Sequence, residues 1–328
     1  MDRRSKIRAA IYGVLVALLI VQIFDFVGGY DYIKDWFYTP DEHVSEIIDH
    51  LDLTSRGRRI FEATSPSLDS RDTFNEKCES HNVDIYVLGC YLTADDVIHL
   101  YNVEEAELEG VKEATAAHEL LHAVYLRLPF WEKSSLNNQL KAVYDSLENG
   151  DDIKDSMKLY NDDDFYDELH SRLGTEKKDL PYDLEKHYEA IFNDQDKIVD
   201  YYIKYSGVFK KYEQETEALG KKIDNLQAEI ESIEKRLLTA ADDLNKRIDN
   251  YNNRVQTNNY TDLNAIRTEG MNLQAEVDKL KSEGNALDKK IDEYNGLITE
   301  YNNSVVKTNK IYDSINSNST LIEETINN

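Results

Sequence analysis

The stretch Thr115–Leu128, TAAHELLHAVYLRL, lies in the first half of the 328-residue chain and is the part of the sequence that most strongly indicates the fold. It contains no proline or glycine, and its acidic and basic residues are Glu119 and Arg127. A run of this composition favours a helix that is largely buried. His118 and His122 are four residues apart, a spacing that puts two side chains on one face of a helix. The stretch therefore predicts a buried helix with two adjacent imidazole rings.

Two histidines at this spacing, with a glutamate after the first, are typical of a metal-dependent hydrolase. Their ring nitrogens can bind one zinc ion. The carboxylate of Glu119 can accept a proton from a water molecule that the metal activates. A chain with this content of histidine and acidic residues is expected to contain the His-Glu-x-x-His pattern by chance at most roughly 0.04 times. We therefore predict a zinc site with His118 and His122 as ligands and Glu119 as the general base.

A third protein ligand is expected, because catalytic zinc usually has three. The segment Glu168–Glu176, ELHSRLGTE, resembles the second helix of the gluzincin metallopeptidases. In that family a glutamate ligand is followed three residues later by a small residue, as Glu168 is followed by Ser171. The resemblance covers roughly residues 80 to 176 and implies that Glu168 is the third ligand. Together with a helical hairpin, these motifs also resemble uncharacterised membrane-anchored bacterial proteins of the zincin type.

The segment departs from the gluzincin pattern at one position. Where that family often has an aspartate that orients a metal-binding histidine, this chain has Arg172. Glu176 and His170 therefore remain alternative third ligands. The family resemblance also implies that the edge strand before the zinc helix, here Val97–Val103, receives the substrate as an added strand. Tyr160 or Tyr166 is a candidate donor to the oxyanion that forms during hydrolysis.

The N-terminus has the pattern of a membrane anchor. Residues 9–24 carry no charge, and with the following residues to 27 they approach the length of about 20 that crosses a bilayer. Four basic residues precede the run, which predicts that the N-terminus stays in the cytoplasm and the rest is exported. A cleaved signal peptide, with Gly28-Gly29 as a weak processing site, remains the alternative. The aromatic stretch Tyr30–Pro40 that follows is typical of a membrane interface.

Residues 29–204 are predicted to form a zincin-like domain that is mainly α-helical with a small β-sheet. Ile85–Leu92 and Val97–Val103 are suited to strands. A helix capped by Asp41 should bury Val44, Ile47, Ile48 and Leu51. Thr54–Asp72 is polar and rich in turn residues, helical pattern runs from about Leu136 to Leu173, and Asp183–Lys204 is expected to be one helix. The cysteines Cys78 and Cys90 either form a disulfide or remain buried thiols.

Beyond residue 204 apolar residues recur at spacings of four and three. The first series runs from Leu219 to Val255, the polar segment QTNNYTD at 256–262 interrupts it, and a second series runs from Ile266 to Val305. A sustained heptad repeat predicts a coiled coil. Two arms of similar length around a polar turn predict an antiparallel hairpin over residues 205–316, followed by a flexible tail at 317–328.

The formal charge of −26 argues against nucleic acid as a partner, because phosphate binding requires a basic surface. The function predicted from these features is a membrane-anchored, Zn²⁺-dependent endopeptidase that hydrolyses exported or cell-surface proteins. The alternative is a non-catalytic surface stalk, with a vestigial or structural metal site. In either case the coiled coil is a candidate site for a protein partner, and residues 9–27 contact the lipid bilayer.

Overall fold

The computed structural model describes residues 29–78, 87–160 and 164–317. The predicted anchor at 9–27 and residues 318–328 of the predicted tail lie outside these ranges. Within the described ranges, no helix is both long enough and apolar enough to span a bilayer. The chain divides into two units, of which the second comprises residues 209–310 and the first comprises the remainder.

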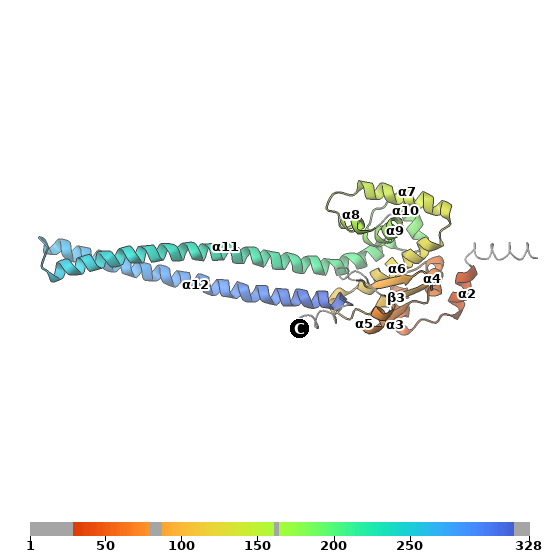
Figure 1. The fold of residues 1–328 in the computed structure, drawn as a ribbon, viewed down its shortest axis with the longest axis horizontal. Coiled ribbons are helices and arrows are strands. Elements are labelled where there is room, and N and C mark those ends of the chain that lie inside the picture. The colour runs from red at the N-terminus through yellow and green to blue at the C-terminus, as the bar shows by residue number, and fades with distance from the viewer. Residues whose placement is uncertain (1–28, 79–86, 161–163, 318–328) are drawn as a thin grey trace, which may run out of the picture. The chain divides into compact units, whose positions relative to one another are not determined.

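The described residues are mainly helical with one small sheet, as the sequence predicts (Figure 1). The first unit contains, in chain order, α2 (Gly29–Phe37), α3 (Glu42–Leu51), α4 (Ser55–Ala63), β1 (Ser67–Asp69), α5 (Arg71–Lys77), β2 (Gly89–Leu92), β3 (Val97–Tyr101), α6 (Val111–Arg127), α7 (Phe130–Ser146), α8 (Asp152–Ser156), α9 (Phe165–Glu176) and α10 (Tyr182–Glu189). Two further helices follow, α11 (Gln195–Gln256) and α12 (Leu263–Ile315).

The helix α6 is the centre of the first unit. It contacts the strands β2 and β3 as well as the helices α3, α4 and α9. Its alanines Ala116, Ala117 and Ala123 are completely buried, and their small side chains let neighbouring elements approach closely. The predicted helix with two adjacent histidines is confirmed, since α6 covers both of them.

The capped helix after Asp41 is also confirmed, as α3. The side chain of Asp41 accepts a hydrogen bond from the backbone N–H of Val44 at 2.8 Å. The four apolar residues that the sequence assigned to the buried face are all at most 3% exposed. Capping and helical periodicity together were therefore sufficient to predict this element.

The sheet has the strand order β1-β3-β2. β3 pairs in parallel with β1, with Ser67 opposite His99, and antiparallel with β2, with Cys90 opposite the same histidine. The prediction that Val97–Val103 is an edge strand is wrong, because β3 has a partner on both sides. The edge strand next to α6 is β2, within the run Ile85–Leu92. The error arose because Ser67–Asp69 is too short and too polar to be recognised as a strand.

Two other sequence expectations differ from the structure. The polar region Thr54–Asp72 contains α4 and β1; Thr54 caps α4 by accepting a hydrogen bond from the backbone N–H of Gly57 at 3.1 Å. The expected continuous helix over 183–204 is interrupted between α10 and α11. There the chain turns to bury Ile191 and Phe192 completely. A gain in apolar burial of this kind outweighs a few helical hydrogen bonds.

A disulfide joins Cys78, at the end of α5, to Cys90 in β2. The bond resolves the alternative that the sequence left open. It links the edge strand β2 covalently to the residue that ends α5, twelve positions earlier in the chain. The disulfide therefore constrains the strand that lies beside α6.

In the second unit, the facing parts of α11 and α12 run antiparallel. Residues with increasing numbers along α11 pair with residues with decreasing numbers along α12. The cross-helix pairs are Thr216 with Ser304, Glu229 with Lys290, Arg236 with Glu283, Arg247 with Glu276 and Arg254 with Glu269. Four of these five contacts are ion pairs with partly exposed side chains, which fix the pairing of the two helices more than they stabilise it.

Two helical glycines provide a matched test of the packing. A Cβ at Gly57 would lie 2.3 Å from the carbonyl oxygen of Ile191, whereas nothing lies within 4 Å of a Cβ at Gly207 in α11. We expect Gly57→Ala to destabilise the first unit by about 1–3 kcal/mol through overpacking. Gly207→Ala should stabilise it by about 0.5–1 kcal/mol through helix propensity. Urea unfolding followed by near-UV circular dichroism measures both, because buried aromatic rings of this unit such as Tyr188 lose their fixed surroundings when it unfolds. Equal shifts of the two midpoints would contradict the packing described.

Candidate metal centre

The two histidines of α6 converge on one point. The Nε2 atoms of His118 and His122 are 3.1 Å apart, and the ring planes are nearly perpendicular. Both rings belong to the same helix face, one turn apart, as the i,i+4 spacing requires. The pair therefore presents two nitrogen donors to the same small volume.

Glu168 of α9 supplies the third donor atom. Its Oε2 lies 3.7 Å from Nε2 of His118 and 3.6 Å from Nε2 of His122. Tetrahedral zinc with bonds of about 2.0–2.2 Å separates its ligand atoms by roughly 3.3–3.5 Å. The three distances lie around that value, so the cluster has the size and the chemistry of a zinc site with three protein ligands. Within the described ranges, it is the one group of three or more His, Cys, Asp or Glu residues in such an arrangement.

The close approach of α9 to α6 depends on Gly174. A Cβ at this position would lie 2.5 Å from both Cδ1 of Leu121 in α6 and Cε1 of Tyr188. Any larger residue would push the helices apart and move Glu168 away from the histidines. The glycine in the ELHSRLGTE segment is therefore required by packing.

The two alternative ligands are outside the cluster of three, although Glu176 lines the same cavity. His170 is completely buried, with its Nε2 2.8 Å from Nε2 of His187 and its ring stacked on Tyr188. Glu176 accepts a hydrogen bond from Arg172 at 3.0 Å. The described residues thus bring Glu168, and not these two, to the histidine pair.

Arg172 explains how the site accommodates the departure from the gluzincin pattern. Its Nε donates to Oε1 of Glu168 at 2.6 Å, and its Nη1 donates to Glu176. The guanidinium thereby occupies one oxygen of Glu168 and leaves Oε2 directed at the histidines. Burial raises the pKa of Glu168, but His118 and Arg172 together hold it well below its usual range. The carboxylate is therefore kept ionised, as a metal ligand must be.

Asp167 has the role that the sequence analysis sought at position 172. Its Oδ1 lies 2.9 Å from Nδ1 of His122, so it can accept the N–H of that ring and direct Nε2 toward the cluster. Burial lowers the pKa of His122, but Asp167 and the carboxylates of Glu119 and Glu168 raise it to about 9. In the sequence, Asp167 directly precedes the candidate ligand Glu168. The gluzincin pattern predicts the orienting carboxylate after Ser171 instead, so Asp167 was not predicted.

Glu119 lies beneath the edge strand, next to the histidines. It is 7% exposed, and the backbone of Tyr91 in β2 hydrogen bonds to its carboxylate. Burial raises the pKa of Glu119, against the opposing effect of the two histidines. A Cβ at Gly89 would come within 2.8 Å of Cγ of Glu119, so the glycine allows β2 to approach the acid this closely. A buried carboxylate with a raised pKa beside a metal site is suited to accept and return a proton.

The cluster opens into a cavity of about 420 Å³. Besides the metal-binding groups, the lining includes Tyr160, Arg172 and two tyrosines from the start of α11, Tyr202 and Tyr205. Tyr160 forms hydrogen bonds with Arg172 and Glu168, and burial raises its pKa. Both Tyr160 and Tyr166 pack against the hydrophobic core, but of the two it is Tyr160 that lines the cavity, so Tyr160 is the candidate donor at the site. Tyr202 and Tyr205 were not predicted to line the cavity, because no motif in the sequence indicates that this part of α11 lies beside it.

No protein-family profile, curated protein sequence or solved structure matches the chain. The resemblance to gluzincins therefore rests on the two helix motifs and stays a prediction.

The position of Asp167 predicts an effect on metal affinity. We expect Asp167→Asn to weaken zinc binding by about 10–100-fold, because the imidazole of His122 loses its negatively charged partner. Competition with a chelator of known affinity measures the change. Asp183→Asn on α10, an exposed residue, is the matched control and should leave zinc affinity unchanged. Equal affinities for the two variants would rule out an orienting role for Asp167.

Arg172 makes a second prediction. In Arg172→Gln, Oε1 of Glu168 loses its charged partner, so the carboxylate is no longer held with Oε2 toward the histidines. We expect zinc affinity at pH 7.5 to fall by about 10–100-fold. Arg172→Lys retains the charge and should restore part of the affinity. Equal affinities of all three proteins in competition with a chelator would contradict this role.

Proposed function

We propose that the protein is a zinc-dependent endopeptidase. The observation that carries this proposal is the convergence of His118, His122 and Glu168 at distances suited to one zinc ion, with the buried acid Glu119 beside them. Three protein ligands that leave a further position open are typical of catalytic rather than structural zinc. The adjoining cavity supports this assignment, since a purely structural site is closed by its ligands.

Each residue has a distinct part in peptide hydrolysis. When bound, the metal lowers the pKa of a water molecule and polarises the scissile carbonyl. Glu119 accepts a proton from the attacking water as its oxygen bonds to the carbonyl carbon. As the carbon–nitrogen bond breaks, Glu119 returns the proton to the departing nitrogen. The hydroxyl of Tyr160 has one proton, which it would turn from Glu168 to the oxygen that becomes negatively charged.

The strand β2 is suited to hold the substrate. Among the described strands it pairs with β3 alone, so its outer edge has backbone groups available for an extended peptide. Gly89, at the start of β2, lines the same cavity as the histidines and Glu119. A peptide added along this edge would pass the metal centre in an extended conformation. Backbone pairing of this kind recognises an unfolded segment rather than one particular side chain.

The sequence supports the place where this activity would occur. Residues 9–27 would anchor the chain in the cell membrane, with the N-terminus in the cytoplasm and the zincin-like domain outside. The substrates would then be exported or cell-surface proteins. The heptad pattern supports an antiparallel coiled coil in the second unit, which could position a substrate or bind a protein partner.

Substitution of the metal-binding residues and of the base separates metal binding from hydrolysis. We expect Glu119→Gln to retain one zinc per chain and to lower the hydrolysis of casein by roughly 10²–10⁴-fold, because the proton acceptor is lost. His118→Ala should lose both zinc and activity. Metal analysis and a casein assay on the full chain measure these effects, and Glu185→Gln, at an exposed position of α10, is the control. A purified native protein without stoichiometric zinc would exclude the proposal.

The second candidate function is a non-catalytic surface stalk, favoured by the length of the hairpin formed by residues 209–310. The two functions predict opposite results in cells. If the protein acts as a stalk, Glu119→Gln should preserve the phenotype, whereas deletion of the hairpin should abolish it. If it acts as a peptidase, Glu119→Gln alone should reproduce the effect of removing the whole protein.

A further inference from the structure

The exposed apolar side chains of the first unit are concentrated in two segments. Among its described residues, the large apolar side chains that are exposed outside these segments are Leu159, Tyr182 and Ile203. We use the name aromatic face for the others, which lie in α2 and at the junction of α6 and α7: Tyr30, Tyr32, Ile33, Trp36, Phe37, Leu126, Phe130 and Trp131. Soluble proteins rarely expose large apolar patches that have no partner.

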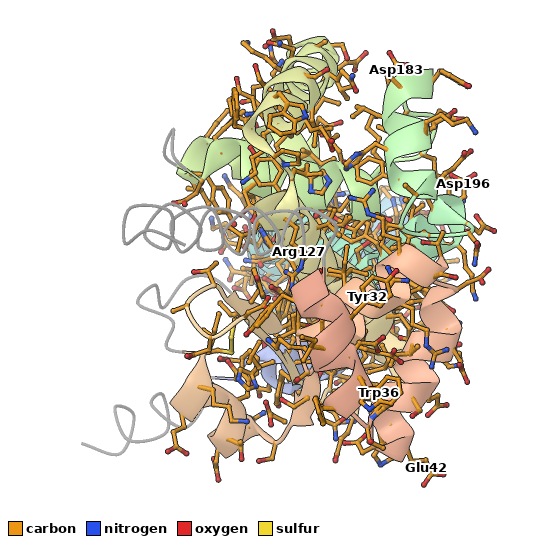
Figure 2. All side chains as sticks on the ribbon, turned by 90° about the vertical axis from the view of Figure 1, so that its right-hand side faces the viewer. Tyr32, Trp36, Glu42, Arg127, Asp183 and Asp196 are labelled. Atoms are coloured by element: carbon orange, nitrogen blue, oxygen red, sulfur yellow. A yellow bond between two sulfur atoms is a disulfide. The ribbon has the colours of Figure 1, made fainter. Side chains whose placement is uncertain are left out.

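An ion pair brings the two segments together. Asp31 lies between two tyrosines of α2, and Arg127 directly follows Leu126 in α6. Both Nε and Nη2 of Arg127 donate to Asp31, at 2.9–3.1 Å. Such a bidentate pair fixes orientation as well as distance. Figure 2 shows Tyr32, Trp36 and Arg127 on the same side of the unit.

Three members of the aromatic face are more than three-quarters exposed. Trp36 is 84% exposed, Phe37 80% and Phe130 79%. The guanidinium of Arg59 is 3.7 Å from the ring centre of Tyr32, whereas the ammonium of Lys34, 5.6 Å from the ring centre of Tyr30, is paired with Asp96 at 3.0 Å. Exposed aromatic rings beside a long basic side chain such as Arg59 match the chemistry of the bilayer interface, where the rings enter the headgroup layer and the cation reaches water or phosphate.

The chain before α2 identifies the surface that would cover this face. The structure describes α2 from Gly29 onward, and the apolar run that the sequence predicts to cross the membrane ends at residue 27. An extended chain covers at most about 3.6 Å per residue, so a span that ends at residue 27 would leave α2 within roughly 10 Å of the membrane surface. The overall charge of −26 excludes general attraction to anionic lipid as the cause of docking.

We propose that the aromatic face is a membrane-docking surface, which inserts into the headgroup region of the lipid bilayer and holds the first unit against it. The proposal is independent of the zinc-peptidase function. It extends the membrane contact from the predicted anchor to a second segment, at the α6–α7 junction, that is distant in sequence.

The two tryptophans of the chain both belong to the aromatic face, so their fluorescence tests the proposal directly. The full chain is reconstituted in phosphatidylcholine vesicles with or without bromine atoms on the upper acyl carbons. Trp131→Phe leaves the signal of Trp36, and Trp36→Phe leaves that of Trp131. We expect the brominated lipid to lower each signal by roughly twofold, because an indole at the headgroup level lies close to those carbons.

A matched probe controls for simple proximity to the vesicle. Tyr182→Trp, in a chain with both native tryptophans replaced by phenylalanine, places an indole at another exposed position of the same unit. Its emission should be unaffected by bromine. Quenching of Trp131 no greater than that of this probe would overturn the proposal, because Trp36 alone could be quenched through its closeness to the anchor.

Two further outcomes overturn the proposal. If a second copy of the chain covers the aromatic face, both indoles should be protected from water without quenching by bromine, and dilution in detergent should expose them. If docking is electrostatic, high salt should abolish the quenching. The expected result is quenching that salt leaves unchanged. Since neither measurement requires zinc or hydrolysis, a negative result here is distinguishable from failure of the proposed peptidase function.

Discussion

The close packing of α9 against α6 is the constraint on which the rest of the first unit depends. The histidines are fixed within α6 by helix geometry, but they become a three-ligand cluster when α9 brings Glu168 within 3.7 Å. That approach needs a residue without a side chain at Gly174, and it needs the fully buried Leu121 and Tyr188 on either side of it. Burial of these apolar groups, at about 25 cal/mol per Å², provides the free energy that holds several charged groups in a partly dry interior. The candidate metal centre is therefore a product of packing as much as of the identity of its three residues.

The same packing buries charged side chains, and α9 itself supplies the oppositely charged partners that they need. Glu168, Arg172 and Glu176 are spaced at i, i+4 and i+8, so the guanidinium lies between two carboxylates on one helix face. Each of the three side chains is at most 23% exposed, so none of the charges could remain there without its partner. Asp167, on the adjacent position, compensates His122 in the same way. One helical segment thus supplies a candidate metal ligand, the group that orients this side chain, and the group that orients one of the histidines.

Local sequence signals were sufficient for the elements whose burial follows a helical period. The capped helix α3, the histidine helix α6 and the glutamate at 168 could all be predicted from spacing, capping or motif. Features that depend on contacts between distant segments could not. β1 is recognisable as a strand when β3 is seen to pair with it, and the break before α11 follows from the burial of Ile191 and Phe192. Asp167 and the cavity tyrosines of α11 were missed for the same reason, since their roles arise from the tertiary approach of helices.

α6 also connects the metal centre with the aromatic face. His118 precedes Leu126 by eight residues and His122 precedes it by four, which correspond to about 12 Å and 6 Å along a helix. Because Arg127 at the end of the same helix is bound to Asp31 of α2, the distance between the metal centre and the docking surface is set by a rigid element rather than by a linker. With the aromatic face in the headgroup layer, the cavity would be held roughly within 15 Å of it along α6. A peptidase with this geometry would reach extended segments close to the membrane surface, such as the membrane-proximal parts of other anchored proteins, more readily than sites far from the bilayer. The short ion pair between α2 and α6 would then determine substrate choice without touching the substrate.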